Sequence, residues 1–481
     1  MISKNFIKSS FIYTLAGALP MASAIILLPF YGEYLSPEAM GALSIYFGFS
    51  LLVQILVTYS FDASLYINYH EFKNEPAKLS SFISSAFILI LLISLITGLL
   101  LAFIGDWFFS KMFTKDDILF YPFGLLSVAT GIFQALQKVN NTLLQTQQKP
   151  TLFLWFNLLS FSLIAGFTIV GLYLFPESLW GPIAGRLVAT LISAAWVLGF
   201  IFRQFGFYFN WQLLKTTFAF NNSTLVYQVQ QWVINFFDRP FILLFLPLAT
   251  LGVYDLALKC LMAVEFVLVG LNSTFTPKVL GIALAQKEKG STIEINRYYH
   301  GLTAVAMLLV SASIFIFPWV IEIFFKKPGY QQAVPLLPYV AIIYLFRCMR
   351  LYVAIPYPAL KYTKPLPVFY LVVLLVKVGL MYLLIGRYGI YGVIVSTWLS
   401  YILEIIILYF GIRKKFTFKI NFAKMVVAPL SLAILILILE PIFGQAYQNA
   451  LHGFYMMVTV VMLAWAFRNE SKVFQLTKIF K

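Results

Sequence analysis

The feature that most constrains this chain is a succession of apolar runs, each at least about as long as a bilayer-spanning helix, separated by short polar connectors. Hydrophobic residues make up 61% of the 481 residues and charged residues only 11%. A soluble domain has roughly 45–50% apolar and about 25% charged residues. So many apolar side chains can be covered only by lipid, and we expect an all-α polytopic membrane protein.

The apolar runs predict about 14 transmembrane helices. Their approximate centres lie near Met21, Leu52, Leu91, Gly131, Ser162, Leu191, Val229, Phe266, Val310, Ile343, Val376, Thr397, Ala433 and Val460. The first run contains Ala22-Ser23-Ala24, which imitates a signal-peptidase site, but it continues to Phe30 and is too long for a signal sequence. We therefore expect it to be retained as the first membrane helix.

The net charge of +16 is distributed through the connectors and does not form a domain or a face, so we expect no nucleic-acid partner. On one side, the connectors and the two termini carry 23 basic residues; the other side carries five, Lys111, Lys115, Lys326, Lys327 and Arg387. Basic residues favour the cytoplasmic side of a membrane. An even number of helices with both termini in the cytoplasm satisfies this rule.

Three pairs of small or turn-forming residues recur at a spacing of 211 positions. They are Pro29-Phe30 with Pro240-Phe241, Gly41 with Gly252, and Gly181 with Gly392. Because six helices separate the members of each pair, orientation is preserved and the halves would be parallel repeats. The predicted domains are a six-helix bundle over 1–205, a second over 206–415, and two further transmembrane helices with a cytoplasmic tail over 416–481.

Polar side chains form a stripe in the seventh apolar run. Asn221, Thr224, Gln228, Gln231, Asn235 and Asp238 follow one another at steps of 3, 4, 3, 4 and 3. This spacing places them on one helix face, which cannot face hydrocarbon because amides find no hydrogen-bond partner there. The stripe either forms hydrogen bonds with another helix or lines a hydrophilic cavity able to bind sugar hydroxyls. A weaker stripe in the fourth run, which could also be a solvated helix end, comprises Ser127, Gln134, Lys138, Asn141 and Gln145.

Charged side chains within the spans are costly and often functional. The candidate substrate-binding cations are Arg186, Arg239, Arg347, Arg350, Lys377 and Lys138. They could attract a diphosphate, and the planar guanidinium of Arg binds two phosphate oxygens at once. The candidate residues for ion coupling or gating are Asp62, Asp238, Asp255, Lys259 and Glu404.

Several of these charges also have a purely structural interpretation. Asp255 and Lys259 are four residues apart and are expected to pair with each other. Lys377 could be a structural partner of Glu404. Asp62 could lie at a helix end near the cytoplasm.

Catalytic and metal-binding residue patterns are missing from the sequence. Cys260 and Cys348 lie within apolar runs, and His70, His300 and His452 are expected near solvated helix ends without metal-ligand spacing. We therefore expect no metal, no cofactor and no enzyme. A membrane glycosyltransferase, polymerase or ligase would need an acid–base or metal site, often on a large extramembrane loop, and no carboxylate pair lies on such a loop.

Several short segments resemble a known family in their order and spacing. They are Pro29-Phe30 followed by Leu35-Ser36-Pro37-Glu38-Ala39-Met40-Gly41, then Gln148-Lys149-Pro150, Phe237-Asp238-Arg239-Pro240, Gly252-Val253-Tyr254, Ala257-Leu258-Lys259 and Tyr388-Gly389-Ile390-Tyr391-Gly392. With them the chain resembles the polysaccharide (O-antigen) repeat-unit flippases, the Wzx type, of the MATE-like multidrug and oligosaccharidyl-lipid exporter superfamily. One departure is Phe61-Asp62-Ala63, where many relatives carry a Gly-Leu-Asp-like element followed by Arg, which leaves the role of Asp62 open.

The resemblance implies a V-shaped, MATE-like fold of two bundles, alternating access and a cationic central cavity. It implies a polyprenyl-diphosphate-linked oligosaccharide such as an undecaprenyl diphosphate conjugate as substrate, moved across the bacterial cytoplasmic membrane among membrane lipids. It also implies coupling to a proton or sodium gradient, with polysaccharide polymerase and chain-length machinery as partners. A lipid II flippase, a multidrug/cation antiporter and a teichoic-type polymer exporter are alternatives of similar fold.

Overall fold

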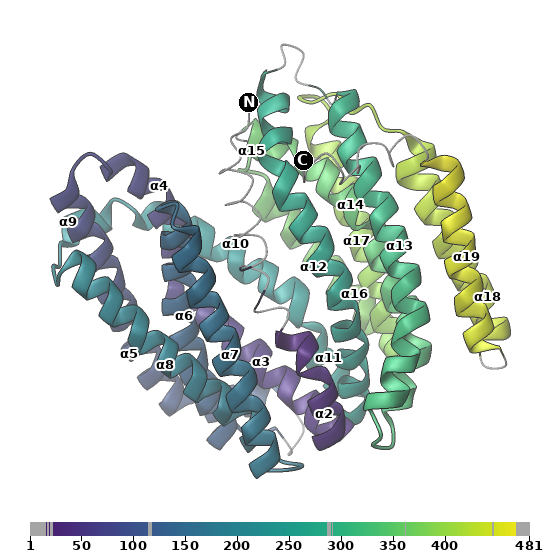
Figure 1. Cartoon of the computed structure of the whole chain (residues 1–481), viewed down its shortest axis with the longest axis horizontal. Coiled ribbons are helices and arrows are strands. Elements are labelled where there is room, and N and C mark those ends of the chain that lie inside the picture. Colours follow the sequence, from purple (N-terminus) through teal and green to yellow (C-terminus); the bar gives the residue numbers. More distant parts are fainter. Residues whose placement is uncertain are drawn as a thin grey trace. The chain divides into compact units, whose positions relative to one another are not determined.

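The computed structural model describes residues 16, 19, 23–113, 118–285, 290, 292–360, 362–444 and 447–467. Contacts divide the chain into two compact units, Met1–Gly252 and Val253–Lys481. The described part is helical throughout and contains no β-strand, only an isolated bridge between Gly290 and Thr417. An all-α fold, predicted from the apolar runs, is confirmed (Figure 1).

The described part of the first unit contains ten helices and the first turn of an eleventh. They are α2 (Leu28–Tyr34), α3 (Pro37–Thr58), α4 (Phe61–Phe72), α5 (Pro76–Met112), α6 (Leu125–Thr146), α7 (Pro150–Leu174), α8 (Trp180–Phe205), α9 (Trp211–Lys215), α10 (Phe218–Phe236), α11 (Asp238–Phe245) and the start of α12 (Leu248–Ala285), with a π-helical turn η1 (Phe120–Gly124) before α6. Proline in the first turn starts α3, α5 and α7, where its missing N–H costs nothing. Ser36 also caps α3 by accepting a bond from the Ala39 amide at 3.3 Å.

The second unit holds the rest of α12 and the helices that follow. They are α13 (Ile293–Phe324), η2 (Tyr330–Leu336), α14 (Leu337–Ala354), α15 (Pro356–Ala359), α16 (Leu366–Tyr388), α17 (Ile390–Ile412), η3 (Ala423–Val427), α18 (Ala428–Phe443) and α19 (Gln448–Ala466). Helix α13 packs along α14 and α19, and α14 packs along α17 and α18. Helices α18 and α19 are the two C-terminal helices expected beyond the repeat.

Eleven helices of the described part are long and apolar enough to cross a membrane. Thirteen of the 14 expected centres fall within helices, while the first, Met21, lies outside the described residues. Helices α6 and α10, the two with polar stripes, are not among these eleven although they have 22 and 19 residues. A multi-pass membrane protein is therefore confirmed, and the count of 14 stays a prediction.

Helices α3 and α12 approach each other closely at Gly41 and Gly252, one of the three pairs that recur at a spacing of 211 positions. A Cβ at Gly252 would overlap the carbonyl oxygen of Pro37, and a Cβ at Gly41 would overlap that of Leu248. Small residues allow such backbone contact between membrane helices. The crossing therefore depends on the absence of side chains at both positions.

Replacing Gly252 by Ala is expected to destabilise the protein by about 1–3 kcal/mol, because the methyl group would meet rigid backbone. The measurement is thermal unfolding of the purified protein in detergent. Gly199→Ala on α8 is the matched control, since nothing lies within 4 Å of its added Cβ. Equal unfolding temperatures for the two variants would contradict the crossing.

The other glycine pair, Gly181 and Gly392, occupies similar places in two helical hairpins. Gly181 near the start of α8 meets the backbone of Gly171 near the end of α7. Gly392 near the start of α17 meets the backbone of Leu384 near the end of α16. In both hairpins a glycine near the start of the second helix contacts the backbone of the first.

Candidate functional site

The polar stripe of the seventh apolar run lies mainly on α10, which ends at Phe236. Asp238 begins the separate helix α11, so the expected single six-residue stripe is divided between two helices. Along α10 the stripe passes from buried to exposed: Asn221 is buried, Thr224, Gln228 and Gln231 are half-buried, and Asn235 is exposed. Such a gradient leaves the amides near Asn235 accessible to a polar ligand.

Gln228 connects α10 to the first bundle through two side chains. Its Oε1 accepts a bond from Lys138 Nζ on α6 at 3.1 Å, and its Nε2 donates to Ser60 Oγ at 3.5 Å. Nearby, Tyr59 donates to Asn222, and Trp232 Nε1 donates to the Gly48 carbonyl at 2.8 Å. Part of the stripe therefore forms hydrogen bonds between helices, as the structural interpretation predicted.

Asp62 lies just after a break in the helical backbone. Tyr59 and Ser60, which separate α3 from α4, have φ values of 46° and 57°. This left-handed conformation costs a non-glycine residue about 1–3 kcal/mol and is common at functional sites. Asp62 lies in the first turn of α4, at a helix end as expected, and its Oδ2 is within 3.0 Å of Lys138 Nζ. Its other oxygen is buried without a hydrogen-bond partner in the described part of the chain.

The weaker stripe on α6 points mostly into the bundle. Gln134 is 6% exposed and Ser127 is 3% exposed, and Asn141 exchanges a 3.1 Å bond with Asn157 of α7. Only Gln145 is fully exposed. Helices α3, α7 and α8 therefore cover most of this stripe, while its last member is exposed at the helix end.

Arg186 on α8 stands apart from the other intramembrane cations. Its guanidinium lies 4.4 Å from the ring centre of Phe47. The Gln134 side-chain amide is oriented so that its oxygen and its nitrogen both have hydrogen-bond partners. In this orientation the oxygen accepts bonds from Nε and one terminal nitrogen of Arg186, at 3.0 Å each. Within the described residues, no carboxylate forms an ion pair with Arg186. Neutral contacts hold the group in place and leave its positive charge uncompensated.

Arg239 on α11 contacts residues that are close to it in the sequence. It bonds Asp238 Oδ1 at 2.8 Å and the Asn235 carbonyl at 3.3 Å, and it covers the ring of Phe236 at 4.6 Å. Both charged residues are buried, with exposed fractions of 3% for Asp238 and 8% for Arg239. A substrate phosphate would have to compete with the Asp238 carboxylate for this group.

The second unit contains a network of paired charges on α12, α14 and α17. Arg347 bonds Glu265 and donates to Tyr401 at 2.8 Å, while Arg350 bonds Glu404 at 2.6 Å. The two arginines lie on one face of α14, as their spacing of three predicted. Tyr401, which joins the network, carries no signal in the sequence that separates it from other aromatic residues.

Two expected structural pairs have different outcomes. Asp255 and Lys259 form an ion pair of 2.8 Å, as their spacing predicted. The carboxylate of Glu404 instead pairs with Arg350, so Lys377 is not needed to neutralise it. Lys377 is buried on α16, with 5% of its surface exposed.

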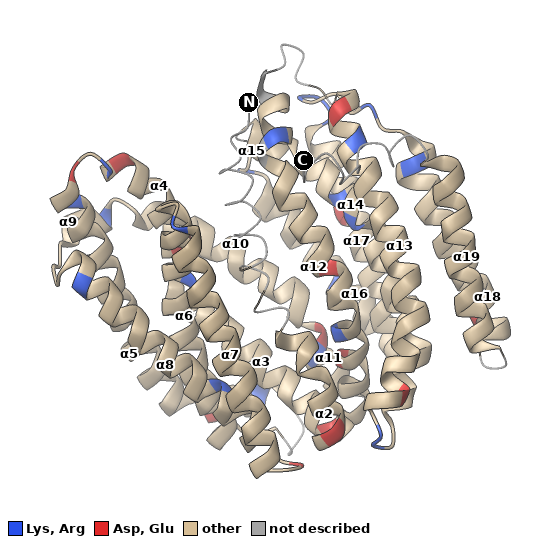
Figure 2. Cartoon of the chain, viewed as in Figure 1, with Lys and Arg blue, Asp and Glu red and all other residues tan. Residues whose placement is uncertain are grey.

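Several acidic side chains within the membrane helices are neutralised by basic side chains. Five intramembrane acids, the four sequence candidates and Glu265, each have a basic partner: Asp62 with Lys138, Asp238 with Arg239, Asp255 with Lys259, Glu265 with Arg347, and Glu404 with Arg350. Arg186 and Lys377 are not members of these five pairs, and among the described residues no carboxylate forms an ion pair with Arg186. Figure 2 shows the remaining Lys and Arg mainly in connectors and at helix ends.

The sequence interpretation missed the burial of two histidines and one acid. We expected all histidines near solvated ends, which is wrong for His300 and His452, because their exposed fractions are only 6% and 1%. Helix packing covers both, and His452 contacts Glu440, a buried acid on α18. The signal for Glu440 was available, because it is a single acid inside an apolar run.

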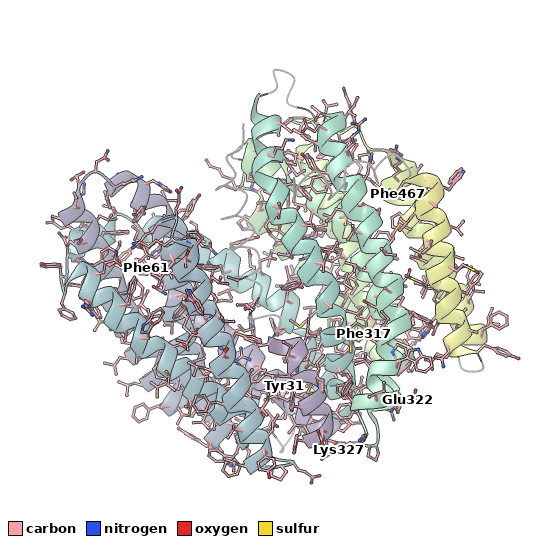
Figure 3. The ribbon with its side chains drawn as sticks, in the orientation of Figure 1. Tyr31, Phe61, Phe317, Glu322, Lys327 and Phe467 are labelled. Atoms are coloured by element: carbon pink, nitrogen blue, oxygen red, sulfur yellow. The ribbon has the colours of Figure 1, made fainter. Side chains whose placement is uncertain are left out.

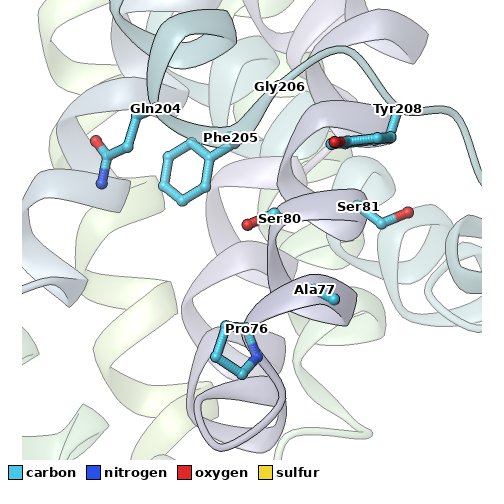
Figure 4. Close-up of a pocket in the computed structure, with 8 residues that line it drawn as sticks. All are labelled: Pro76, Ala77, Ser80, Ser81, Gln204, Phe205, Gly206 and Tyr208. Atoms are coloured by element: carbon cyan, nitrogen blue, oxygen red, sulfur yellow. The ribbon is translucent and has the colours of Figure 1, made fainter.

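A cavity of about 590 Å³ lies at one end of the first unit (Figure 4). It is lined by Pro76, Ala77, Ser80, Ser81, Gln204, Phe205, Gly206 and Tyr208. Ser84 and Ser85 hold the adjacent chain by bonds to the amides of Tyr208 and Asn210, at 2.9 and 2.8 Å. None of the predicted site residues lines this cavity.

Comparison with known proteins gives a family and a fold. A family model described as "Polysaccharide biosynthesis protein" matches residues 6–279, more than half of the chain. No curated protein matches the chain at a significant level.

Solved structures resemble the chain over most of its length. The lipid II flippase MurJ in an inward closed conformation has a TM-score of 0.72 at 15% identity, covering 95% of this chain and 99% of that one. An inward-facing multidrug resistance MATE family transporter of the MOP superfamily has a TM-score of 0.66 at 14% identity, covering 83% and 95%. A MOP superfamily transporter from Pyrococcus furiosus has a TM-score of 0.52 at 14% identity, covering 85% and 95%. The expected MATE-like fold class is thereby confirmed, and the chain belongs to the polysaccharide biosynthesis protein family as a multi-pass membrane protein with the fold of the MOP-superfamily transporters.

Proposed function

We propose that this protein is a flippase that moves a polyprenyl-diphosphate-linked oligosaccharide from the cytoplasmic to the outer leaflet of the bacterial cytoplasmic membrane. Membership of a polysaccharide biosynthesis family supports a glycan substrate. Similarity in fold to a protein titled lipid II flippase supports a lipid-linked one. In this proposal both termini lie in the cytoplasm, transport occurs by alternating access, and a polymerase with its chain-length machinery takes the delivered repeat units.

The observation that carries the proposal is the uncompensated charge of Arg186 at membrane depth. A lone cation within a span is costly and marks a functional site. Arg186 is oriented by Gln134 and Phe47, both neutral, so its charge remains for an anion to neutralise. A diphosphate is such an anion, and the guanidinium suits its oxygens.

The amide side chains of α10 support the proposal that the substrate carries sugars. Gln231 is half-buried and Asn235 is exposed, and neither is committed to the pair formed by Lys138 and Asp62. Amides both donate and accept hydrogen bonds, so this part of the helix can bind hydroxyl groups. Lys138 and Gln228 would join this surface when the bond between them opens.

Four of the ion pairs support coupling to an ion gradient. A proton taken up by Asp62, Asp238, Asp255 or Glu404 would remove the charge that holds the basic partner, and the freed cation could then bind substrate phosphate. A sodium ion replacing the base would act in the same way.

The test is a flipping assay with purified protein in proteoliposomes. We expect the protein to move a fluorescent polyprenyl-diphosphate oligosaccharide between leaflets, faster with an imposed proton or sodium gradient. The matched control lipid carries the same glycan on a polyprenol without the diphosphate, and it should stay in place. Transport of cationic drugs in place of the glycolipid, or a changed glycan linkage, would contradict the proposal in favour of an antiporter or an enzyme.

A lipid II flippase is the second candidate, favoured by the match to MurJ over 95% of this chain, compared with 83% for the MATE transporter. Both candidates share a diphosphate-linked substrate and differ in the attached sugars. Adding lipid II as a competitor to the same assay separates them. Lipid II should compete strongly only if it is the physiological substrate, and depletion of the protein would then be lethal.

A further inference from the structure

The strongest unassigned feature lies in the C-terminal helix pair, outside the charges considered so far. Glu440 of α18 contacts two residues of α19: His452 Nε2 at 3.3 Å and the Tyr455 hydroxyl at 3.0 Å, one on each carboxylate oxygen. The exposed fractions of these residues are 6% for Glu440, 1% for His452 and 0% for Tyr455. We call this set the Glu440 cluster.

Among the described residues, no Lys or Arg forms an ion pair with Glu440. Tyr339 of α14 and Tyr391 of α17 lie within electrostatic reach of Glu440, and both are neutral in the ordinary pH range. Helix α13, which packs along α19, contributes an uncharged contact of 2.6 Å between Ser311 and Thr459. Among the described residues, His452 is the base that forms an ion pair with Glu440.

His452 has one ring nitrogen left over. Nε2 contacts the Glu440 carboxylate, whereas Nδ1 is buried and has no hydrogen-bond partner in the described part of the chain. A carboxylate accepts bonds, so Nε2 carries the hydrogen in the neutral ring, and Nδ1 then holds the free lone pair. A buried carboxylate without a cation is costly in a membrane. Protonation of Nδ1 would convert this site from a net charge of −1 to zero.

We propose that the Glu440 cluster is a proton-binding site, with His452 Nδ1 as the atom that accepts the proton. The proton comes from water and adds to the imidazole, which becomes an imidazolium paired with Glu440. Occupancy by the proton strengthens the contact between α18 and α19. The proton site itself rests on these contacts alone, while a role in driving transport would rest on the proposed function.

The position of the cluster indicates where the proton enters. Glu440 is near the end of α18, and His452 is near the start of α19. Figures 1 and 3 show these helix ends on the same side of the second unit as Glu322 and Lys327. In the orientation predicted from the basic connectors, this is the outer side of the membrane.

The test uses full-length protein in detergent with nitrogen-15-labelled histidine. His452→Gln keeps a donor to Glu440 at the position of Nε2 but cannot take up a proton, and its missing signal assigns the resonance of His452. We expect that resonance to change from neutral to doubly protonated on acidification. Glu440→Gln should change the pH at which this happens. A His452 resonance that stays neutral from pH 5 to pH 9, roughly the range in which histidines titrate, would overturn the proposal.

Unfolding temperature provides a second readout that does not depend on transport. The difference between the wild-type protein and His452→Gln should grow as the pH falls, because only the wild type gains the ion pair. Thr459→Val, which removes the neighbouring uncharged contact, is the matched control and should give a difference that does not vary with pH. A constant difference for both variants would reduce the cluster to a structural contact. The flipping assay on His452→Gln then tests coupling separately, so failure of the proposed function would leave the proton site standing.

Discussion

Replacing Arg186 by Gln is expected to slow flipping of the diphosphate-linked glycolipid by about 10- to 100-fold, because a hydrogen bond to a charged group contributes roughly 1.5–3 kcal/mol. Little loss of stability is expected. Arg186 has no carboxylate partner among the described residues, so its removal strands no buried acid. The Gln134 amide and the Phe47 ring would then face a shorter, neutral side chain that can still form hydrogen bonds.

The measurement is the initial flipping rate in proteoliposomes at equal amounts of folded protein. Arg203→Gln is the matched control: it removes the same charge from the exposed end of the same helix. Arg186→Lys should recover part of the rate, since a lysine keeps the charge but not the planar fork. If Arg186→Gln and Arg203→Gln flip at the same rate, Arg186 does not bind the diphosphate.

The sequence predicts the helices well because lipid imposes a simple rule on composition. Every expected centre except Met21, which lies outside the described residues, is found in a helix. Helices α6 and α10 are predicted from their apolar runs although they are more polar than the other spans, and their polar residues keep helical spacing. In this chain, the polar residues within membrane helices identify α6 and α10 as helices that contribute to the candidate site.

The pairing of charges could be predicted only where the partners are close in sequence. Asp255 and Lys259 are one helical turn apart, so helix geometry alone brings them together. Arg347 and Glu265 are 82 positions apart, and their contact depends on how α12 and α14 pack. Sequence spacing contains no information on that packing.

The same limit explains the assignment of Glu404. Lys377 and Arg350 were both intramembrane cations, and the sequence offered no way to choose between them. The packing of α14 against α17 brings Arg350 within 2.6 Å of the carboxylate. Helix α16 also packs against α17, so proximity of the helices alone would not have decided the partner.

Replacing Glu404 by Leu is expected to destabilise the protein by about 3–5 kcal/mol, because it leaves Arg350 as an uncompensated buried charge. The Glu404 and Arg350 side chains are only 5% and 17% exposed. The double variant Glu404→Leu with Arg350→Met should recover most of the loss, since replacing a whole buried pair by apolar residues is often neutral or stabilising. The measurement is a double-mutant cycle of unfolding free energies in detergent.

The exposed ion pair between Lys278 and Glu294 is the control that tests whether the loss of stability depends on burial of the pair. Its atoms are also 2.6 Å apart, but the two side chains are 49% and 50% exposed. Glu294→Leu should therefore cost at most about 1 kcal/mol. If the double variant at 350 and 404 is as unstable as Glu404→Leu alone, the loss comes from packing and not from the stranded charge. If it folds normally but fails to flip the glycolipid, Arg350 contributes to transport beyond its ion pair, since stability alone would then no longer account for its presence in the membrane.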